Sequence, residues 1–267
     1  MIQDIAPHVL HNEYKPVMPK EGDYVFIYDG NNILMKNNEA FYRYEDLPHD
    51  LHFTFLLTID DKSCFMADYH NSNAVSLNTY NLRFYFPRHL AFAAITGWQI
   101  YAWMRINRYC GKCGTAMEMD KKERAMRCPK CNNIVYPRIM PAVIVGVIND
   151  KDQLLVTKYA HGRYQKYALV AGFNEIGETI EETCIREVKE ETGLDVEKLT
   201  YYKSQPWGFT STLLFGFYAH VKGSDAITMC EEELRVARWA ERNENIETGG
   251  NASLTSEMIA NFMKGKI

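Results

Sequence analysis

Residues 172–194 read GFNEIGETIEETCIREVKEETGL and place a carboxylate-rich segment between two glycines. Thr179 followed three residues later by Glu182 is typical of a helix capping box. Gly193 is typical of the residue that follows a helix C-terminus. The segment between Thr179 and Gly193 therefore predicts a helix of about three to four turns.

This predicted helix has two neighbouring stripes. Three carboxylates at i, i+3 and i+4 share one face, namely Glu187, Glu190 and Glu191. An apolar stripe about a quarter turn away contains Ile180, Cys184 and Val188. The acids therefore lie at the edge of a core, where their mutual repulsion calls for cations such as Mg²⁺ or Mn²⁺. On the helix alone, a solvated face paired with Lys and Arg explains the same pattern.

The spacing around the helix is more specific. Gly172 is followed after five residues by Glu178, and after seven more by REVKEETGL at 186–194. This arrangement resembles the Nudix hydrolase signature at every specified position. The resemblance implies that Glu187 and Glu191 bind divalent cations, and that Glu190 is a third carboxylate able to ligate or to act as a base.

The same resemblance implies supporting roles nearby. Arg186 would pair with Glu178 and hold the loop against the helix, and Ala171 would offer its carbonyl to a metal. Nudix enzymes cleave a diphosphate that links a nucleoside to another group. Such a diphosphate is anionic and repels water as a nucleophile, so cations must neutralise charge and activate the water.

The length and composition of the chain limit its domain organisation and its class of partners. With 267 residues and 46% hydrophobic content, it can bury more than one core. A formal net charge of -4 argues against an overall polycation that grips nucleic acid. The first thirty residues have acids and prolines without an apolar run, so we expect no signal peptide, no membrane span and a cytoplasmic location.

Seven cysteines in such a chain predict thiols and metal ligands rather than disulfides. Four of them form two C-x₂-C pairs separated by fourteen residues: Cys110, Cys113, Cys128 and Cys131. This is the spacing of a zinc ribbon, in which a closed Cys₄ shell makes one Zn²⁺ structural rather than catalytic. The isolated Cys64, Cys184 and Cys230 are interpreted as small buried apolar residues.

The remaining elements predict an α+β chain with three parts. Residues 1–108 form an N-terminal domain, 109–135 the ribbon and 136–267 the Nudix domain. Short β-type runs at 24–28, 32–36, 53–59 and 64–68 predict a small antiparallel sheet. Apolar and aromatic residues at 87–107 follow a helical period, and the stripe of Trp98, Ile100, Tyr101 and Met104 is interpreted as core rather than as a ligand site. Strands near 142–148, 153–158, 167–171, 199–204, 212–221 and 236–240, with a helix at 253–263, suit the α/β/α sandwich that the Nudix resemblance implies.

Two features of the sequence indicate one branch of the Nudix superfamily. A Cys₄ ribbon directly before a Nudix domain, followed by SQPWGFTST at 204–212, is similar to the NADH pyrophosphatase branch, whose usual form is SQPWPFPxS. Gly208 and Thr210 replace prolines, and Thr212 replaces a serine. Loss of two prolines is expected to loosen this loop and to affect substrate fit.

The branch resemblance also implies substrate contacts. The loop would line the dinucleotide pocket with Ser204, Gln205, Pro206, Trp207, Gly208, Phe209, Thr210, Ser211 and Thr212. Tyr136 and Phe173 would stack on a flat ring, Glu233 would add a metal ligand, and Arg83 and Glu123 would contact substrate. Without the resemblance, the favoured interpretation is that Tyr136 and Phe173 are core residues and Glu233 a surface residue.

The resemblance to this branch implies a pyrophosphatase that splits NAD(H) into nicotinamide mononucleotide and AMP, using two or three Mg²⁺ or Mn²⁺ ions. The same cut would remove an NAD cap from the 5′ end of RNA. Members of this branch are dimers, so a homodimer is expected. Other Nudix substrates, such as ADP-ribose or a diadenosine polyphosphate, are an alternative. A nucleic-acid-binding regulator is a third interpretation, which the full set of carboxylates disfavours.

Overall fold

The computed structural model describes residues 1–36, 39–162 and 164–267. The chain forms two compact units. One consists of Met1, Ile139–Trp207 and Thr212–Ile267, and the other of Ile2–Arg138 and Gly208–Ser211. The first contains the expected Nudix segment, and the second contains the N-terminal sheet together with the ribbon.

The first unit is built on a six-stranded mixed sheet. Its main strand order is β14-β15-β11-β12-β16, and β13 also pairs with β11. The strands are β11 (Met140–Ile148), β12 (Leu154–Tyr159), β13 (Val170–Phe173), β14 (Val196–Trp207), β15 (Thr212–Val221) and β16 (Leu234–Ala240). The central β11 runs parallel to β15 and antiparallel to β12 and β13.

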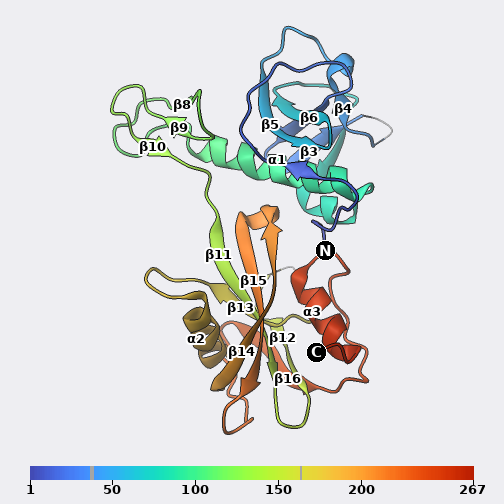
Figure 1. Ribbon diagram of the computed structural model, residues 1–267, viewed down its shortest axis with the longest axis vertical. Coiled ribbons are helices and arrows are strands. Elements are labelled where there is room, and N and C mark those ends of the chain that lie inside the picture. Colours follow the sequence, from blue (N-terminus) through green and yellow to red (C-terminus); the bar gives the residue numbers. More distant parts are fainter. Residues whose placement is uncertain (37–38, 163) are drawn as a thin grey trace. The chain divides into compact units, whose positions relative to one another are not determined.

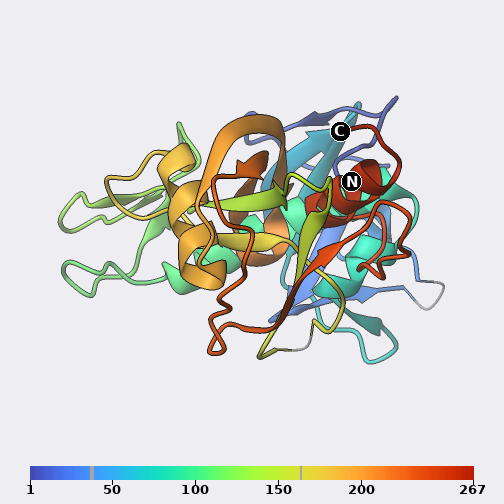
Figure 2. The same ribbon diagram turned by 90° about the horizontal axis from the view of Figure 1, so that it is seen from below.

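Helices cover both faces of this sheet: α2 (Ile180–Thr192) lies on one face and α3 (Leu254–Met263) on the other (Figures 1 and 2). The alternation of side chains along β11 explains this arrangement. Val143 and Val145 belong to the core that includes Val188 of α2, whereas Ile144 belongs to the core that includes Met258 of α3. The expected α/β/α sandwich is therefore present.

The structure confirms the predicted helix at α2. Thr179 is its N-cap and forms the capping box with Glu182, while Gly193 follows the helix in a left-handed conformation with φ 71°. Cys184 is fully buried on the apolar stripe, as expected. An added Cβ at Gly193 would also lie 2.9 Å from Cβ of Thr228, so both backbone angle and space favour glycine there.

The second unit has a seven-stranded sheet with order β1-β5-β6-β2-β3-β7, and β4 also pairs with β2. The strands are β1 (Leu10–His11), β2 (Tyr24–Asp29), β3 (Asn32–Met35), β4 (Tyr42–Arg43), β5 (Phe53–Ile59), β6 (Lys62–Ala67) and β7 (Val75–Asn78). The prediction of an antiparallel sheet is wrong at one place, because β2 and β6 are parallel. The tight β5–β6 hairpin places β6 as the inner strand beside β2, in the same direction.

One long helix, α1 (Arg88–Ile106), packs against this sheet (Figure 1). Short 3₁₀ turns η1 (Tyr44–Asp46) and η2 (Thr79–Phe84) occur earlier in the chain. Ile100 of α1 is buried, and Trp98 and Tyr101 pack half-buried against the same core. The interpretation of this aromatic stripe as core is therefore confirmed.

The ribbon consists of three short antiparallel strands: β8 (Glu118–Met119), β9 (Met126–Arg127) and β10 (Ile134–Val135). Met117 and Met126 share a hydrophobic core with α1 and the N-terminal sheet. Among the isolated cysteines, Cys64 is buried as expected, whereas Cys230 is only half-buried. In the described part of the chain, no helix combines the length and apolarity that a bilayer crossing requires.

The segment expected as a loose loop at 204–212 is largely a hairpin. Strand β14 continues to Trp207 and pairs with β15, with Gln205 opposite Leu214. The turn itself is a single 3₁₀ element, η3 (Gly208–Thr210). Gly208 is buried, and an added Cβ there would lie 3.1 Å from the carbonyl oxygen of Ile95. Strand pairing and close packing therefore hold this segment even without the two prolines.

Candidate functional site

The catalytic candidates meet where β13 ends and α2 begins. Arg186 lies on α2 and its guanidinium contacts several groups at once. Nε donates to Oε1 of Glu178 at 2.6 Å, and Nη2 donates to Oε2 of the same carboxylate at 2.9 Å. Nη2 also donates to the carbonyl of Phe173 at 3.0 Å. The expected Glu178–Arg186 pair is thus present, and it ties the loop before α2 to the helix.

The remaining guanidinium nitrogen of Arg186 faces the carboxylate stripe. Nη1 donates to Oε1 of Glu187 at 2.8 Å and to Oε2 of Glu190 at 2.9 Å. Hydrogen bonding to Arg186, with further bonds from Glu175 N–H and Thr183, lowers the pKa of Glu178 to about 2. Arg186 therefore keeps Glu178 ionised and holds two of the predicted metal-site acids in place.

Glu187 lies directly against the backbone of Gly172. A Cβ added at Gly172 would lie 1.9 Å from Cδ of Glu187 and 2.0 Å from its Oε1. No side chain larger than hydrogen therefore fits at residue 172 while Glu187 keeps its position. Burial raises the pKa of Glu187, although the nearby Arg186 opposes this effect.

Glu191 is the most deeply buried of the helix acids, with 2% of its surface exposed. Burial, and then the charges of Glu187, Glu233 and Glu190, raise its pKa to about 8, although a hydrogen bond from the Ala171 backbone opposes the shift. Among residues 1–36, 39–162 and 164–267, Oε2 of Glu191 is a buried oxygen without a hydrogen-bond partner. Such an oxygen calls for a proton or a cation.

Glu233, the metal ligand predicted to come from outside the helix, lies in the segment just before β16. This segment is held to the end of α2, because Cys230 N donates to the carbonyl of Glu191 at 2.9 Å and Thr228 N donates to that of Thr192 at 2.9 Å. Glu233 is exposed, and its charge raises the pKa of both Glu187 and Glu191. The structure therefore brings Glu233 to the carboxylates of α2, although 42 positions separate it from Glu191 in the sequence.

The donor set suits a hard divalent cation. Glu187, Glu191 and Glu233 offer carboxylate oxygens, and Ala171 has its backbone beside Glu191. Mg²⁺ and Mn²⁺ prefer such oxygen ligands, and a cation would satisfy the unpartnered Oε2 of Glu191. Among the described residues, these carboxylate oxygens do not all lie within 4.8 Å of one another, and Glu233 is exposed.

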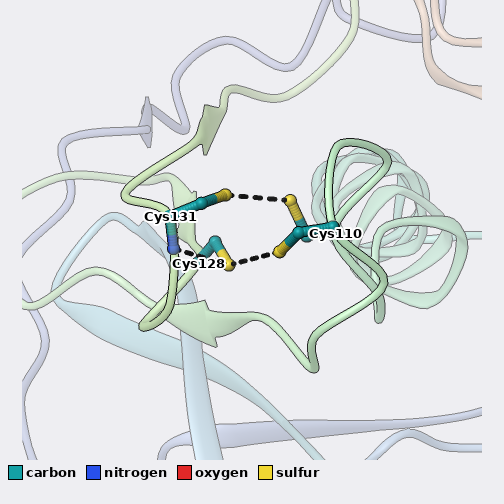
Figure 3. Close-up of side chains that lie close together, drawn as sticks. Cys110, Cys128 and Cys131 are labelled. Carbon is teal, nitrogen blue, oxygen red and sulfur yellow. Dashed lines mark hydrogen bonds between the residues drawn. The ribbon is translucent and has the colours of Figure 1, made fainter.

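The ribbon has a separate metal site. Within the described residues, the one group of three or more His, Cys, Asp or Glu whose ligand atoms all lie within 4.8 Å of one another is Cys110, Cys113, Cys128 and Cys131. Figure 3 shows three of these thiols turned toward one another. The Sγ–Sγ distances are 3.6 Å for Cys110–Cys131 and 3.5 Å for Cys113–Cys128.

These spacings fit zinc rather than disulfides. A tetrahedron of thiolates about 2.3 Å from Zn²⁺ has edges of about 3.8 Å, close to the observed separations. A disulfide needs sulfur atoms about 2.05 Å apart. Because all four ligands come from the protein, the site supports a structural zinc with no open position for water.

The predicted substrate residues fall in both units. In the second unit, Tyr136 is 55% exposed and its hydroxyl donates to Oε1 of Glu123 at 3.0 Å, so two of the predicted contacts lie together. Arg83 lies over the rings of Tyr80 and Phe84 and donates to the Tyr80 hydroxyl at 2.6 Å. In the first unit, Phe173 is 53% exposed, which leaves its ring accessible. Tyr136 and Phe173 are therefore not core residues.

Gln205 has a structural role of its own. Its side chain is fully buried, Nε2 donates to the carbonyl of Ala252 at 2.9 Å, and Oε1 accepts from Leu254 N at 2.6 Å. The amide therefore anchors the start of α3. Thr212 is also buried, whereas Pro206 and Thr210 are exposed and Ser204, Trp207, Phe209 and Ser211 are half-buried.

Sequence reasoning did not identify Asn174 and Thr183. Thr183 is buried and donates to Oε2 of Glu178 at 2.9 Å, and Asn174 donates to Thr183 Oγ1 at 2.7 Å. A signal for Thr183 was available, because it lies one turn before Glu187 on the same helix face. For Asn174 the sequence offered no such signal, since its contact depends on the path of the loop.

Comparisons with known proteins identify two domain types and one similar structure. A NUDIX domain model matches residues 138–262, and a model of the NADH pyrophosphatase zinc ribbon domain matches residues 105–136. A NUDIX hydrolase crystal structure from Nitrosomonas europaea aligns with a TM-score of 0.49 and 25% identity, covering 60% of this chain and 92% of that chain.

Two named relatives are similar over the same region. NAD-capped RNA hydrolase NudC of Pseudomonas aeruginosa (strain LESB58) is 39% identical over 141 residues, which cover 53% of this chain and 50% of that protein. NAD-capped RNA hydrolase NudC of Shigella flexneri is 40% identical over 143 residues, covering 54% and 55%. The chain thus spans about half the length of the curated relatives it matches. It contains a Nudix domain at 138–262, preceded by a zinc ribbon of the NADH pyrophosphatase type at 105–136.

Proposed function

We propose that this protein hydrolyses the diphosphate of NAD(H) to nicotinamide mononucleotide and AMP. The observation that carries the proposal is the buried Oε2 of Glu191, which lacks a hydrogen-bond partner among the described residues. It belongs to a group of acids that Glu187 and Glu233 complete, at the end of a Nudix helix. The zinc ribbon and the names of the similar proteins support the dinucleotide substrate.

The site residues would divide the work between binding and proton transfer. Glu187, Glu191 and Glu233, with the carbonyl of Ala171 and in part Glu190, would hold two or three Mg²⁺ or Mn²⁺ ions. When bound there, such ions would supply positive charge that neutralises the diphosphate and lowers the pKa of a water molecule. One water adds to a phosphorus atom and the anhydride P–O bond breaks, so two monophosphates form. A carboxylate of α2 accepts the proton of the water.

Arg186 contributes without touching the reacting atoms. It holds Glu187 and Glu190 through one nitrogen and Glu178 through the other two. This arrangement fixes the acids before the substrate arrives, so less reorganisation is needed during the reaction. Tyr136 and Phe173 have exposed rings on which a nicotinamide or adenine ring would stack, each worth about 1–3 kcal/mol.

The same cut applies to RNA that begins with NAD, because the diphosphate is identical and the RNA continues from the adenosine. Removal of the cap would leave a 5′-monophosphate. We include three further points in the proposal: catalytic Mg²⁺ or Mn²⁺ rather than another ion, a homodimer and a cytoplasmic location. The seven cysteines, all free of disulfides, support the last point.

The test is direct. Purified protein is incubated with NADH, NAD, ADP-ribose or NAD-capped RNA in Mg²⁺ or Mn²⁺, and the products are identified by mass spectrometry. Nicotinamide mononucleotide and AMP from NADH or NAD support the proposal. Cleavage of ADP-ribose alone would replace it with another Nudix substrate, and no cleavage of any of the four would refute it.

Two variants test the site itself. Glu191→Gln is expected to abolish turnover while zinc content and the circular dichroism spectrum stay unchanged. Glu181→Gln is the matched control, because Glu181 is an exposed acid on the same helix. Full activity of Glu191→Gln would mean that the reaction occurs elsewhere.

A further inference from the structure

A chain of hydrogen bonds reaches the catalytic helix from the central sheet. It begins at Asn174, the first residue after β13, whose backbone N donates to the carbonyl of Pro141 on β11 at 3.1 Å. Asn174 is therefore fixed to the sheet through its backbone. Its side chain then points back toward α2.

The orientation of the Asn174 amide follows from its two partners. Nδ2 lies 3.2 Å from the carbonyl oxygen of Glu178 and 2.7 Å from Oγ1 of Thr183. A carbonyl oxygen can only accept, so the group facing it must be the NH₂ end of the amide. Asn174 therefore donates to both, and Thr183 Oγ1 acts as an acceptor toward Asn174.

This bond leaves the single Thr183 proton for one other acceptor. Oγ1 lies 2.9 Å from Oε2 of Glu178 and 3.1 Å from the carbonyl of Thr179. A carboxylate is the stronger acceptor, and here it is also the nearer one. Thr183 is fully buried, so water does not compete strongly for this bond.

Glu178 connects Thr183 to the acids of α2 through Arg186. Both of its carboxylate oxygens accept from Arg186, whose Nη1 in turn holds Glu187 and Glu190. The Glu178 side chain is 21% exposed and that of Arg186 26%, so water reaches the pair, and further contacts restrict the positions that the Glu178 carboxylate can take. Asn174 and Thr183 supply such contacts from the sheet side and from the helix.

We infer that Asn174 and Thr183 are positioning residues, which orient the Glu178–Arg186 pair and through it hold Glu187 and Glu190 in the arrangement that binds divalent cations. Neither residue touches substrate in this scheme. Its consequence for turnover rests on the proposed function, whereas its consequence for cation binding does not. The Nudix-type spacing of residues 172–194 does not specify either of them.

The main variant is Thr183→Val, which keeps the shape and removes the hydroxyl. Thr192→Val is the matched control, because Thr192 is also fully buried on α2 and its Oγ1 donates only within the helix, to the carbonyl of Val188 at 2.6 Å. Thr183→Ser restores the hydroxyl. Asn174→Ala removes the hydrogen bonds that the Asn174 side chain donates. Asn174 is a half-buried loop residue, where the fold tolerates a shorter side chain more easily.

Three measurements are made on each full-length variant: the melting temperature, the affinity for Mn²⁺ by electron paramagnetic resonance, and kcat and KM with NADH. Thr183→Val and Asn174→Ala are expected to weaken Mn²⁺ binding and to lower kcat by about 10-fold each, with little change in KM. Because both substitutions interrupt the same series of hydrogen bonds, the double variant should lose little more Mn²⁺ affinity and kcat than either single variant. Thr183→Ser should keep most of the wild-type Mn²⁺ affinity and kcat.

A purely structural role predicts a different result. Thr183→Val and Thr192→Val would then lower the melting temperature by similar amounts, with the same Mn²⁺ affinity and kcat as the wild type. That outcome, or additive losses in the double variant, would overturn the inference. If the wild type binds Mn²⁺ but does not cleave NADH, the proposed function fails while the Mn²⁺ titration still decides the role of Asn174 and Thr183.

Discussion

Replacement of Gly172 by alanine is the sharpest perturbation that the structure offers. The new Cβ would lie 1.9 Å from Cδ and 2.2 Å from Oε2 of Glu187. Ordinary carbon–carbon contacts are about 3.5 Å, so the carboxylate must move by about 1.5 Å. That movement breaks the 2.8 Å bond from Arg186 to Glu187 and displaces a predicted cation ligand.

The expected effect falls on activity rather than on folding. A displacement of about 1 Å in a catalytic arrangement costs about 100-fold in rate. Gly172→Ala should therefore lower kcat by about 100-fold or more, equivalent to about 2.7 kcal/mol of transition-state stabilisation. Stability should change little, because the group that moves is a flexible carboxylate whose buried charge is itself unfavourable.

The assay is NADH hydrolysis at saturating Mg²⁺, together with the melting temperature. Gly146→Ala serves as the control, because its Cβ would lie 2.8 Å from the rigid ring of Tyr218 inside the same unit. It should lower the melting temperature and leave kcat close to wild type. The reasoning is refuted if Gly172→Ala keeps full activity, or if it loses activity only because it unfolds.

Three other predictions concern pH, zinc and Gln205. Burial holds the pKa of Glu191 at about 8, above its unfolded value of about 4.3, so the protein without bound Mg²⁺ or Mn²⁺ should lose stability as pH rises from about 4 to 8. Thermal melts in buffer free of Mg²⁺ and Mn²⁺, without a chelator that would remove the ribbon zinc, measure this decline, and Glu191→Gln should remove it. Glu178 has the opposite sign, because its pKa of about 2 makes its contribution disappear as pH falls from about 4 toward 2. Elemental analysis should find about one zinc per chain, lost in Cys128→Ser, and zinc retention in that variant would contradict the Cys₄ assignment. Gln205→Ala should lower the free energy of unfolding by about 2 kcal/mol through two lost buried hydrogen bonds, and an unchanged urea midpoint would contradict this.

Local features of the fold were predictable because neighbouring residues specify them. The capping box at Thr179, the left-handed Gly193 and the two stripes of α2 all follow from side chains within one or two turns. The zinc ribbon is similar, since each C-x₂-C pair forms its own turn and the intervening hairpin brings the pairs together.

Features that depend on distant pairing were predicted less well. The parallel β2–β6 pair requires the position of the β5–β6 hairpin, which no local pattern in β2 or β6 reports. The extension of β14 through Gln205 likewise depends on β15 as a partner, and the role of the Gln205 amide in anchoring the start of α3 was not predicted. Propensity could not decide either case, because strand pairing is set by the partner.

The sequence by itself determined which acids of residues 172–194 share a helix face, and the Nudix resemblance of that segment predicted the pairing of Arg186 with Glu178. The spacing of the two C-x₂-C pairs at 110–131 predicted the zinc ligands. Only the tertiary structure decided how these groups are held. Burial of Glu191, the absence of a Cβ beside Glu187 and the support of Arg186 by Asn174 and Thr183 arise where β11, β13 and α2 pack together. Covalent spacing sets which side chains share a face, whereas desolvation and close contact exist only after the elements have packed.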